Sequence, residues 1–265
     1  VEIVRGSAAT LAGGGSEAGV IHLTTRRAER LGGSLTAAAG SDDARRLGGD
    51  VGHRSGRWGF HLSGSREETE GFRQNAGTEL RRLGGSVRFD IADRRRLELS
   101  IVDGSGRLGN PGALTEEELD DDPSVAPYNA LDYSDERLTQ TSLNFRGPLA
   151  GPLSLAANLF YTDRATESLT TGRAAPLYGG FFLDLEGPTV GSTVQVGHSL
   201  RDGERRNELV AGMEWLDGDA DATGYYTSPD DPGVVDRHPE IQATATTVAT
   251  ANARVDERRI MTPLL

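Results

Sequence analysis

The chain opens with the run Val1-Glu2-Ile3-Val4-Arg5-Gly6 and continues, past Gly13-Gly14-Gly15, into the run Gly19-Val20-Ile21-His22-Leu23-Thr24-Thr25-Arg26. β-Branched and other apolar residues favour buried strands. The glycines between the two runs permit positive φ angles and tight backbone packing. The stretch 1–26 therefore predicts a strand, a glycine-rich turn and a second strand.

The order and spacing of these runs resemble the end of the plug domain of TonB-dependent outer-membrane receptors. In that family a V-E-[VI]-[LI]-R-G-P segment runs through a glycine-rich turn into G-V-I-N-[IL]-x-T-[KR], which enters the barrel. Ser7, Ala12 and His22 depart from the pattern, and an ordinary β-hairpin is the alternative. The positions that carry the plug motif here are Glu2, Arg5, Gly6, Gly13, Gly15 and Gly19.

Composition narrows the class of protein. The 265 residues include 35 glycines and no cysteine, and all 28 basic residues are arginines. No stretch approaches the roughly 20 apolar residues of a membrane helix, whereas the alternating strands of a membrane barrel are compatible with a low average hydropathy. The absence of cysteine excludes disulfides and thiolate sites. The net charge of −12 argues against nucleic acid as a partner, because phosphates require a basic face.

After Arg26 the chain alternates apolar and polar residues with the period of two that is typical of strands. Trp58, Phe60 and Leu62, for example, alternate with small or polar residues. The pattern predicts an all-β fold, namely a partial antiparallel transmembrane β-barrel of about ten strands, although a soluble sandwich would also alternate. The predicted strands cover residues 31–40, 47–52, 58–63, 83–91, 97–101, 139–145, 153–161, 190–196, 209–215 and 243–254.

The connections between these strands alternate in length and charge. Outer-membrane barrels have short periplasmic turns and long external loops. The short turns here are rich in arginine, whereas the long loops carry runs of Asp and Glu. The predicted short turns are 55–57, 92–95, 147–152 and 201–206, and the predicted long loops are 67–79, 104–135, 163–188 and 217–240, with 41–43 as a short exception on the long side.

Several residues outside the first run are candidates for a site. Tyr128, Tyr133, Tyr225 and Tyr226 lie in predicted long loops, where they could contact a siderophore or corrinoid or pack within the loops. Trp58, Tyr161 and Trp215 fit an interfacial aromatic girdle or a buried core.

Two further motifs, 116–122 and 110–123, lie in the longest predicted loop. The acidic run 116–122 lacks the Asp-x-Asp-x-Asp-Gly pattern of an EF-hand and is predicted to be a solvated external loop. The stretch 110–123 resembles a P-G-x-L-T…D-P sequence in external loops of ferric-citrate-type receptors. The five histidines lack zinc-site spacing, and no catalytic motif lies between a strand and a helix, so no enzyme is predicted.

The family resemblance implies that residues 1–28 are the end of a plug domain and that residues 29–265 are the N-terminal part of a receptor barrel. It also implies import of a scarce solute, such as an iron–siderophore or similar metal chelate, across the outer membrane of a Gram-negative bacterium. The implied partners are that chelate, outer-membrane lipid and a TonB-type inner-membrane energy-coupling complex. The contact site for the complex would precede Val1, so the chain is expected to be a fragment; no cofactor is expected.

Three alternatives to this reading remain open from the sequence. A smaller outer-membrane barrel, such as a porin or an autotransporter translocator, would have similar strands. A soluble β-rich binding module would need no detergent. A β-rich hydrolase would need carboxylates that converge in space.

Overall fold

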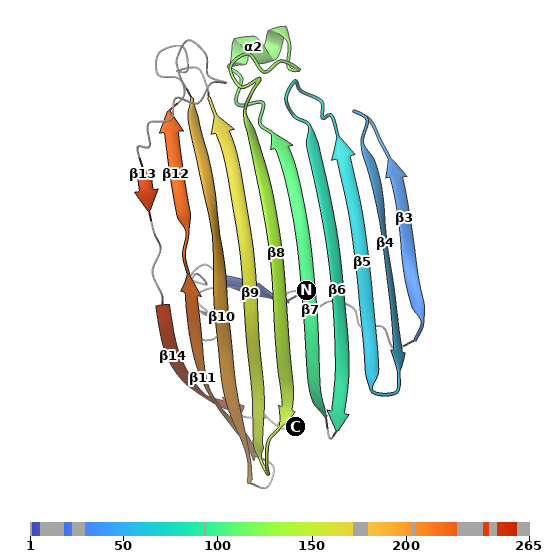
Figure 1. Ribbon diagram of the computed structural model, residues 1–265, viewed down its shortest axis with the longest axis vertical. Coiled ribbons are helices and arrows are strands. Elements are labelled where there is room, and N and C mark those ends of the chain that lie inside the picture. Colours follow the sequence, from blue (N-terminus) through green and yellow to red (C-terminus); the bar gives the residue numbers. More distant parts are fainter. Residues whose placement is uncertain are drawn as a thin grey trace, which may run out of the picture.

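Almost all of the described chain lies in one large antiparallel sheet (Figure 1). The computed structural model describes residues 2–5, 19–22, 30–92, 94–171, 180–202, 205–226, 241–243 and 248–258. Within these ranges no helix is long and apolar enough to span a membrane. The strands of the sheet are β3 (Gly32–Ala39), β4 (Arg45–Ser55), β5 (Trp58–Thr69), β6 (Thr78–Ala92), β7 (Arg95–Gly109), β8 (Tyr133–Pro148), β9 (Leu153–Thr170), β10 (Phe181–Asp202), β11 (Arg205–Gly218), β12 (Asp221–Tyr226), β13 (Ile241–Ala243) and β14 (Val248–Arg258).

From β3 to β11 each strand pairs with the next one along the chain, so the sheet is an up-and-down meander with two open edges, consistent with a partial barrel. β11 and β12 both pair with β10, and β14 and β13 in turn pair with β11 and β12. β11 and β12 together therefore cross the sheet once, as a single pass with an interruption. β13 and β14 do the same beside them. The twelve strands make ten passes, which confirms the predicted fold.

One of these interruptions explains a proline inside a strand. β10 pairs with β12 up to Glu186 and with β11 from Thr189 onward, so Pro188 lies opposite the break between these two partners. A proline has no N–H to donate and is tolerated where a ladder is already broken. The backbone of Asp219 enters this gap, and a Cβ on Gly187 would lie 1.9 Å from the Asp219 carbonyl oxygen.

The prediction of a loop over 163–188 is wrong. β9 ends at Thr170 and β10 begins at Phe181, so only residues 171–180 lie between the two strands.

The two faces of the sheet differ in chemistry. Cross-strand register places the apolar residues of neighbouring strands in continuous rows on one face. One such row is Phe60, Val87, Leu99, Leu143 and Leu159. The other face carries Ser, Thr, Asn, Gln and charged residues. We refer to the two as the apolar face and the polar face.

No described part of the chain covers the apolar face. Leu99 is 51% exposed and Trp58 is 58% exposed. Among the described residues, Ala126 and Leu169 are the only buried hydrophobic side chains. A soluble sandwich packs the apolar faces of two sheets against each other, so this arrangement contradicts that alternative. Lipid can cover an apolar face only on the outside of a barrel, so the apolar face is the convex one.

The apolar rows have the height of a membrane barrel. On β9 they run over the nine residues Leu153–Tyr161, which at about 3.3 Å per residue and with the usual tilt span roughly 25 Å. Trp58 and Phe89 pack together at the short-turn end, with ring centroids 4.5 Å apart. Tyr161 marks the opposite end of the rows. Trp58 and Tyr161 are exposed rather than in a core, in line with the predicted girdle, and Phe89 is half-buried.

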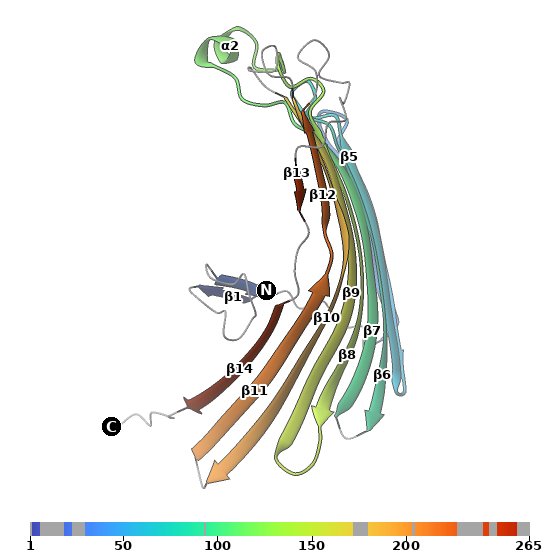
Figure 2. The same ribbon diagram turned by 60° about the vertical axis from the view of Figure 1, so that its left-hand side comes forward.

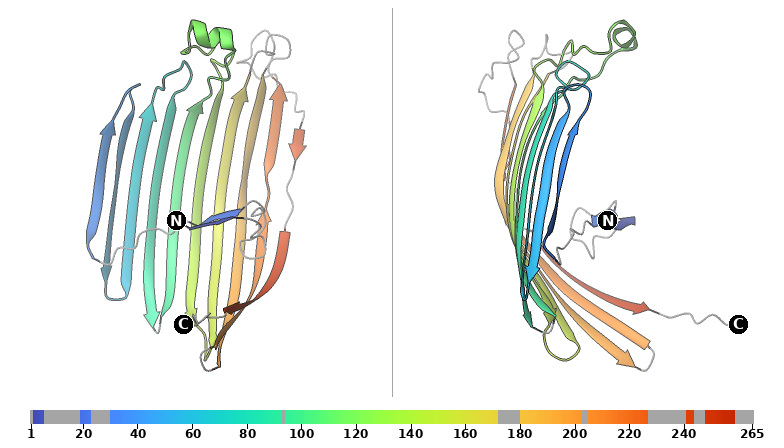
Figure 3. Two further views of the ribbon diagram at one scale, coloured as in Figure 1. Left: turned by 180° about the vertical axis from the view of Figure 1, so that it is seen from behind. Right: turned by 90° about the vertical axis from the view of Figure 1, so that its right-hand side faces the viewer.

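The sheet is strongly curved, and the first two strands lie on its concave side (Figures 2 and 3). β1 (Glu2–Arg5) and β2 (Gly19–His22) pair with each other in register from Glu2 opposite His22 to Arg5 opposite Gly19. They form a separate two-stranded sheet, which confirms the predicted pair of strands. Gly6, Gly13 and Gly15 of the plug motif lie outside the described residues.

Candidate functional site

At the long-loop end of the sheet, the described loops are joined to one another by side-chain hydrogen bonds. The strands continue beyond the apolar rows, to Thr69 and Thr78 around one loop and to Gly109 and Tyr133 around the next. The loops are therefore 70–77 and 110–132, shorter than the predicted 67–79 and 104–135. Alternation of apolar and polar residues disappears there because neither face of the sheet meets lipid, while backbone pairing continues.

Arg73 anchors the longer loop. Its guanidinium donates from Nη1 to the Gly112 carbonyl oxygen at 2.6 Å, and from Nη2 to the carbonyl oxygens of Val125 at 2.8 Å and Pro111 at 3.2 Å. Its Nε donates to Val125 as well, at 3.3 Å. One half-buried cation therefore satisfies backbone acceptors from both halves of loop 110–132, which holds that loop in a fixed shape.

A second anchor joins three loops through the buried carboxylate of Asp132, which is fully inaccessible to solvent. The carboxylate accepts from the backbone N–H of Thr171 at 2.8 Å and from Asn129 Nδ2 at 2.6 Å. Asn75, at a φ of 55°, donates from Nδ2 to the carbonyl oxygens of Asn129 and Asp132 at 2.5 and 2.7 Å. Loops 70–77 and 110–132 and the end of β9 are therefore one hydrogen-bonded unit.

Loop 110–132 contains a short helix, α2 (Glu116–Asp121), at the top of Figure 1. Thr115 Oγ1 accepts from the N–H of Glu118 at 3.3 Å, and Glu118 Oε2 accepts from the N–H of Thr115 at 2.8 Å. This capping box follows from the sequence Thr115-x-x-Glu118. The acidic run 116–122 is therefore helical for most of its length rather than irregular. Hydrogen bonds from Ser124 hold the pKa of Asp122 below its usual range. Among the described residues no group of three or more His, Asp or Glu is placed to hold a metal ion.

The four predicted tyrosines do not share one environment. Tyr128 is half-buried, and its carbonyl oxygen accepts from Thr171 Oγ1 at 2.7 Å. Tyr133 lies in register on the apolar face, above the apolar rows. Tyr225 and Tyr226 pair through their backbones with Phe182 and Phe181, and their side chains lie outside the described part of the structure. Ligand contact by these tyrosines stays a prediction.

Tyr133 is held by charged neighbours. Its hydroxyl donates to Glu167 Oε1 at 2.7 Å, and Arg107 Cζ lies 4.8 Å from the ring centroid. Burial, reinforced by the hydrogen bond to Glu167, raises the pKa of Tyr133 to about 12.

This shift predicts a distinct alkaline titration. Because the folded pKa is above the unfolded value of about 10, the contribution of Tyr133 to stability is complete below pH 10 and is lost between pH 10 and 12. The difference in tyrosinate absorbance between the wild type and Tyr133→Phe should have its midpoint near pH 12. Glu167→Gln should lower that midpoint, and an unchanged midpoint would show that Glu167 does not bind the hydroxyl.

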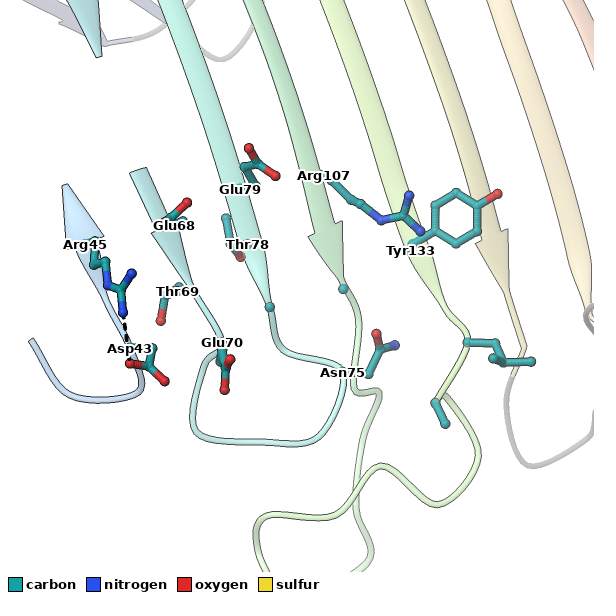
Figure 4. A pocket seen from close by; sticks show the side chains of 14 residues that line it. Asp43, Arg45, Glu68, Thr69, Glu70, Asn75, Thr78, Glu79, Arg107 and Tyr133 are labelled. Atoms are coloured by element: carbon teal, nitrogen blue, oxygen red, sulfur yellow. Dashed lines mark ion pairs between the residues drawn. The ribbon is translucent and has the colours of Figure 1, made fainter. Parts of the chain in front are cut away.

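A hollow of about 560 Å³ lies beside Tyr133 at the rim of the sheet (Figure 4). Its strand residues Glu68, Glu79 and Arg107 share the register of the apolar face, so it opens outward. An ion pair of 3.6 Å joins Asp43 and Arg45 at its edge. Because it faces away from the concave side, it does not lie on a route through a barrel.

A second hollow, of about 380 Å³, lies where the polar face rises above the level of the apolar rows. Gly104 of β7 leaves it open, whereas the side chain of Leu80 covers Gly106, and exposed arginines flank the hollow on β6 and β9. Its polar-face residues are Leu80, Arg82, Gly104, Gly106, Leu108, Glu136, Leu138 and Arg164. No local sequence pattern marks this group, because its members come together only once the register of four strands is known.

The structure of the chain is similar to solved receptors, although no protein-family model and no curated protein matches its sequence. BauA, the ferric preacinetobactin receptor of Acinetobacter baumannii, superposes over 94% of this chain at 14% identity and a TM-score of 0.72. The ferripyoverdine receptor of the outer membrane of Pseudomonas aeruginosa superposes over 96% of this chain at 14% identity and a TM-score of 0.68. The ferric citrate transporter FecA superposes over 87% at 14% identity and a TM-score of 0.67.

The chain has the fold of these outer-membrane receptors. The resemblance first read in residues 1–26 is thereby confirmed at the level of fold. The chain spans 41%, 38% and 35% of the lengths of the three receptors. The receptor fold places the apolar face toward lipid and the polar, concave face toward the lumen.

Proposed function

We propose that this chain belongs to a TonB-dependent receptor of the Gram-negative outer membrane that imports a metal chelate, such as an iron–siderophore complex. Residues 1–28 would be the end of the plug domain and residues 29–265 the N-terminal part of the barrel. The proposal rests on the sheet itself. Its apolar face is exposed over the height of a membrane, and the β1–β2 hairpin lies on the concave side of the curved sheet (Figure 3).

The folded loops support a receptor rather than a simple pore. Arg73 and Asp132 fix loop 110–132 in one arrangement at the long-loop end. A fixed external loop suits recognition of a scarce solute, because less conformational entropy is lost when the solute binds. In this proposal the chelate passes along the concave wall when an inner-membrane energy-coupling complex moves the plug, and no covalent chemistry takes place.

The test is uptake of iron by the native gene product. A strain that lacks the gene is compared with the complemented strain for uptake of radioactive iron presented as a panel of ferric chelates. We expect uptake of at least one chelate that depends on the gene and stops when the energy-coupling complex is deleted. Gene-dependent uptake without energy coupling would indicate a porin, and a product that stays in solution without detergent would indicate a soluble binding module.

A further inference from the structure

The polar-face hollow is bounded by two arginines that lie in one row across four strands. Arg82 on β6 is opposite Gly104 on β7, which is opposite Leu138 on β8, which is opposite Arg164 on β9. Neighbouring strands are about 4.8 Å apart, so the two Cα atoms are separated by roughly 14 Å. A ligand much larger than a single phosphate fits between the two side chains.

Glycine makes the floor of the hollow flat. A Cβ added to Gly104 would have the Arg81 carbonyl oxygen, at 3.8 Å, as its nearest neighbour, so the space above this residue is open. Leu138, which is 38% exposed, adds an apolar surface between Gly104 and Arg164. The floor can therefore accept a flat, partly apolar ligand whose charged ends reach the two arginines.

The guanidinium groups of the two arginines are free to bind such a ligand. Among the residues that the structure describes, the side chain of neither Arg82 nor Arg164 forms a hydrogen bond or an ion pair, although both backbones pair within the sheet. On the opposite face, by contrast, Arg66 and Arg81 both pair with Glu79, at 3.1 and 2.6 Å. Unpaired guanidinium groups on a concave wall are suited to bidentate recognition of carboxylates and similar anions.

We propose that Arg82 and Arg164 form an anion-binding site on the lumen wall that selects metal chelates with several peripheral carboxylates or other anionic groups. This rests on the proposed function in import. Glu136 lies two residues before Leu138 on β8, one row nearer the long loops on the same wall. The negative charge of its carboxylate repels anions and so lowers their affinity for the site.

The experiment measures binding of two probes to the purified native gene product in detergent, by quenching of tryptophan fluorescence. The anionic probe is ferric citrate, and the other probe is a neutral ferric trihydroxamate. Arg82→Ala and Arg164→Ala are each expected to weaken binding of ferric citrate by about tenfold or more. Binding of the neutral chelate should change less than twofold. Gly104→Leu should weaken ferric citrate binding without a change of charge, because the leucine fills the hollow.

Two further variants separate the site from general damage. Arg66→Ala removes an exposed arginine of the opposite face that does not line the hollow, and it should leave binding of both probes unchanged. Glu136→Gln should strengthen ferric citrate binding several-fold, a gain that damage to the fold does not produce.

The outcomes distinguish this inference from the proposed function. Wild-type protein that binds only the neutral chelate, or ferric citrate binding that survives both arginine substitutions, would overturn the anion site and leave a chelate receptor standing. Wild-type protein that binds neither probe, from a strain in which the gene supports no iron uptake, would overturn both.

Discussion

Leu143→Arg is expected to destabilise the folded protein in a bilayer. Leu143 lies in the middle of the apolar rows and is 39% exposed, and it faces the side that lipid covers in a barrel. An arginine at the midplane of a membrane barrel costs about 2–4 kcal/mol. The free energy of unfolding in lipid vesicles, measured by urea titration of the native gene product, should fall by about that amount.

Gln140→Arg is the matched control, because Gln140 lies on the same strand, is also exposed, and belongs to the polar face. It should change the free energy of unfolding by less than about 0.5 kcal/mol, as surface substitutions usually do. Equal effects of the two substitutions would contradict the assignment of the faces. If Leu143→Arg were neutral and the protein remained in water, the sheet would not span a membrane.

The second large effect is expected from Arg73→Ala. The substitution removes every side-chain hydrogen bond to the carbonyl oxygens of Pro111, Gly112 and Val125. Leaving such acceptors unsatisfied should destabilise loop 110–132 by roughly 2–4 kcal/mol. Hydrogen exchange of this loop should become at least about 30-fold faster, while exchange in the core of β6 to β9 stays unchanged.

Arg66→Ala is the control for this prediction. Arg66 is an exposed arginine that pairs with Glu68 and Glu79 at 2.9 and 3.1 Å. Exposed pairs of this kind contribute little to stability, so exchange in loop 110–132 should be unaffected. If Arg73→Ala also left exchange in the loop unchanged, the hydrogen bonds of Arg73 would not be what orders it.

The sequence predicts the membrane-height part of the fold well. Trp58, Phe60 and Leu62 alternate with small or polar neighbours because their two sides meet different surroundings. Beyond the apolar rows that difference ends, so residues such as Glu79 and Arg107 show no periodicity although they lie in strands. This is why the predicted strands stop too early and the predicted loops are too long.

Pro188 shows a second limit of sequence reasoning. A proline normally argues against an internal strand, and here it is tolerated because β11 and β12 are interrupted opposite it. That interruption is a property of a partner about 30 residues further along, so no local pattern near Pro188 reveals it. The capping box at Thr115 and Glu118, by contrast, is a local signal that predicts the start of α2.

The candidate sites were the least predictable part. The bonds of Arg73 go to backbone carbonyl oxygens, which every residue type carries, so residue identity at the acceptors gives no signal. Arg82 and Arg164 are brought into one row only through the register of four strands. Tyrosines in long loops are candidates for ligand contact on sequence alone, but the hydroxyl of Tyr133 is already bound to Glu167.

The anchoring of loop 110–132 also constrains the order in which the protein folds. The acceptors of the Arg73 guanidinium lie 38 to 52 residues further along the chain. Closing loops of that length in an unstructured chain has a large entropic cost, which the pairing of β6, β7 and β8 offsets by bringing the ends together first. The outward-facing end is therefore the last part to form, and any delay in strand pairing lengthens the time for which it is open to proteases.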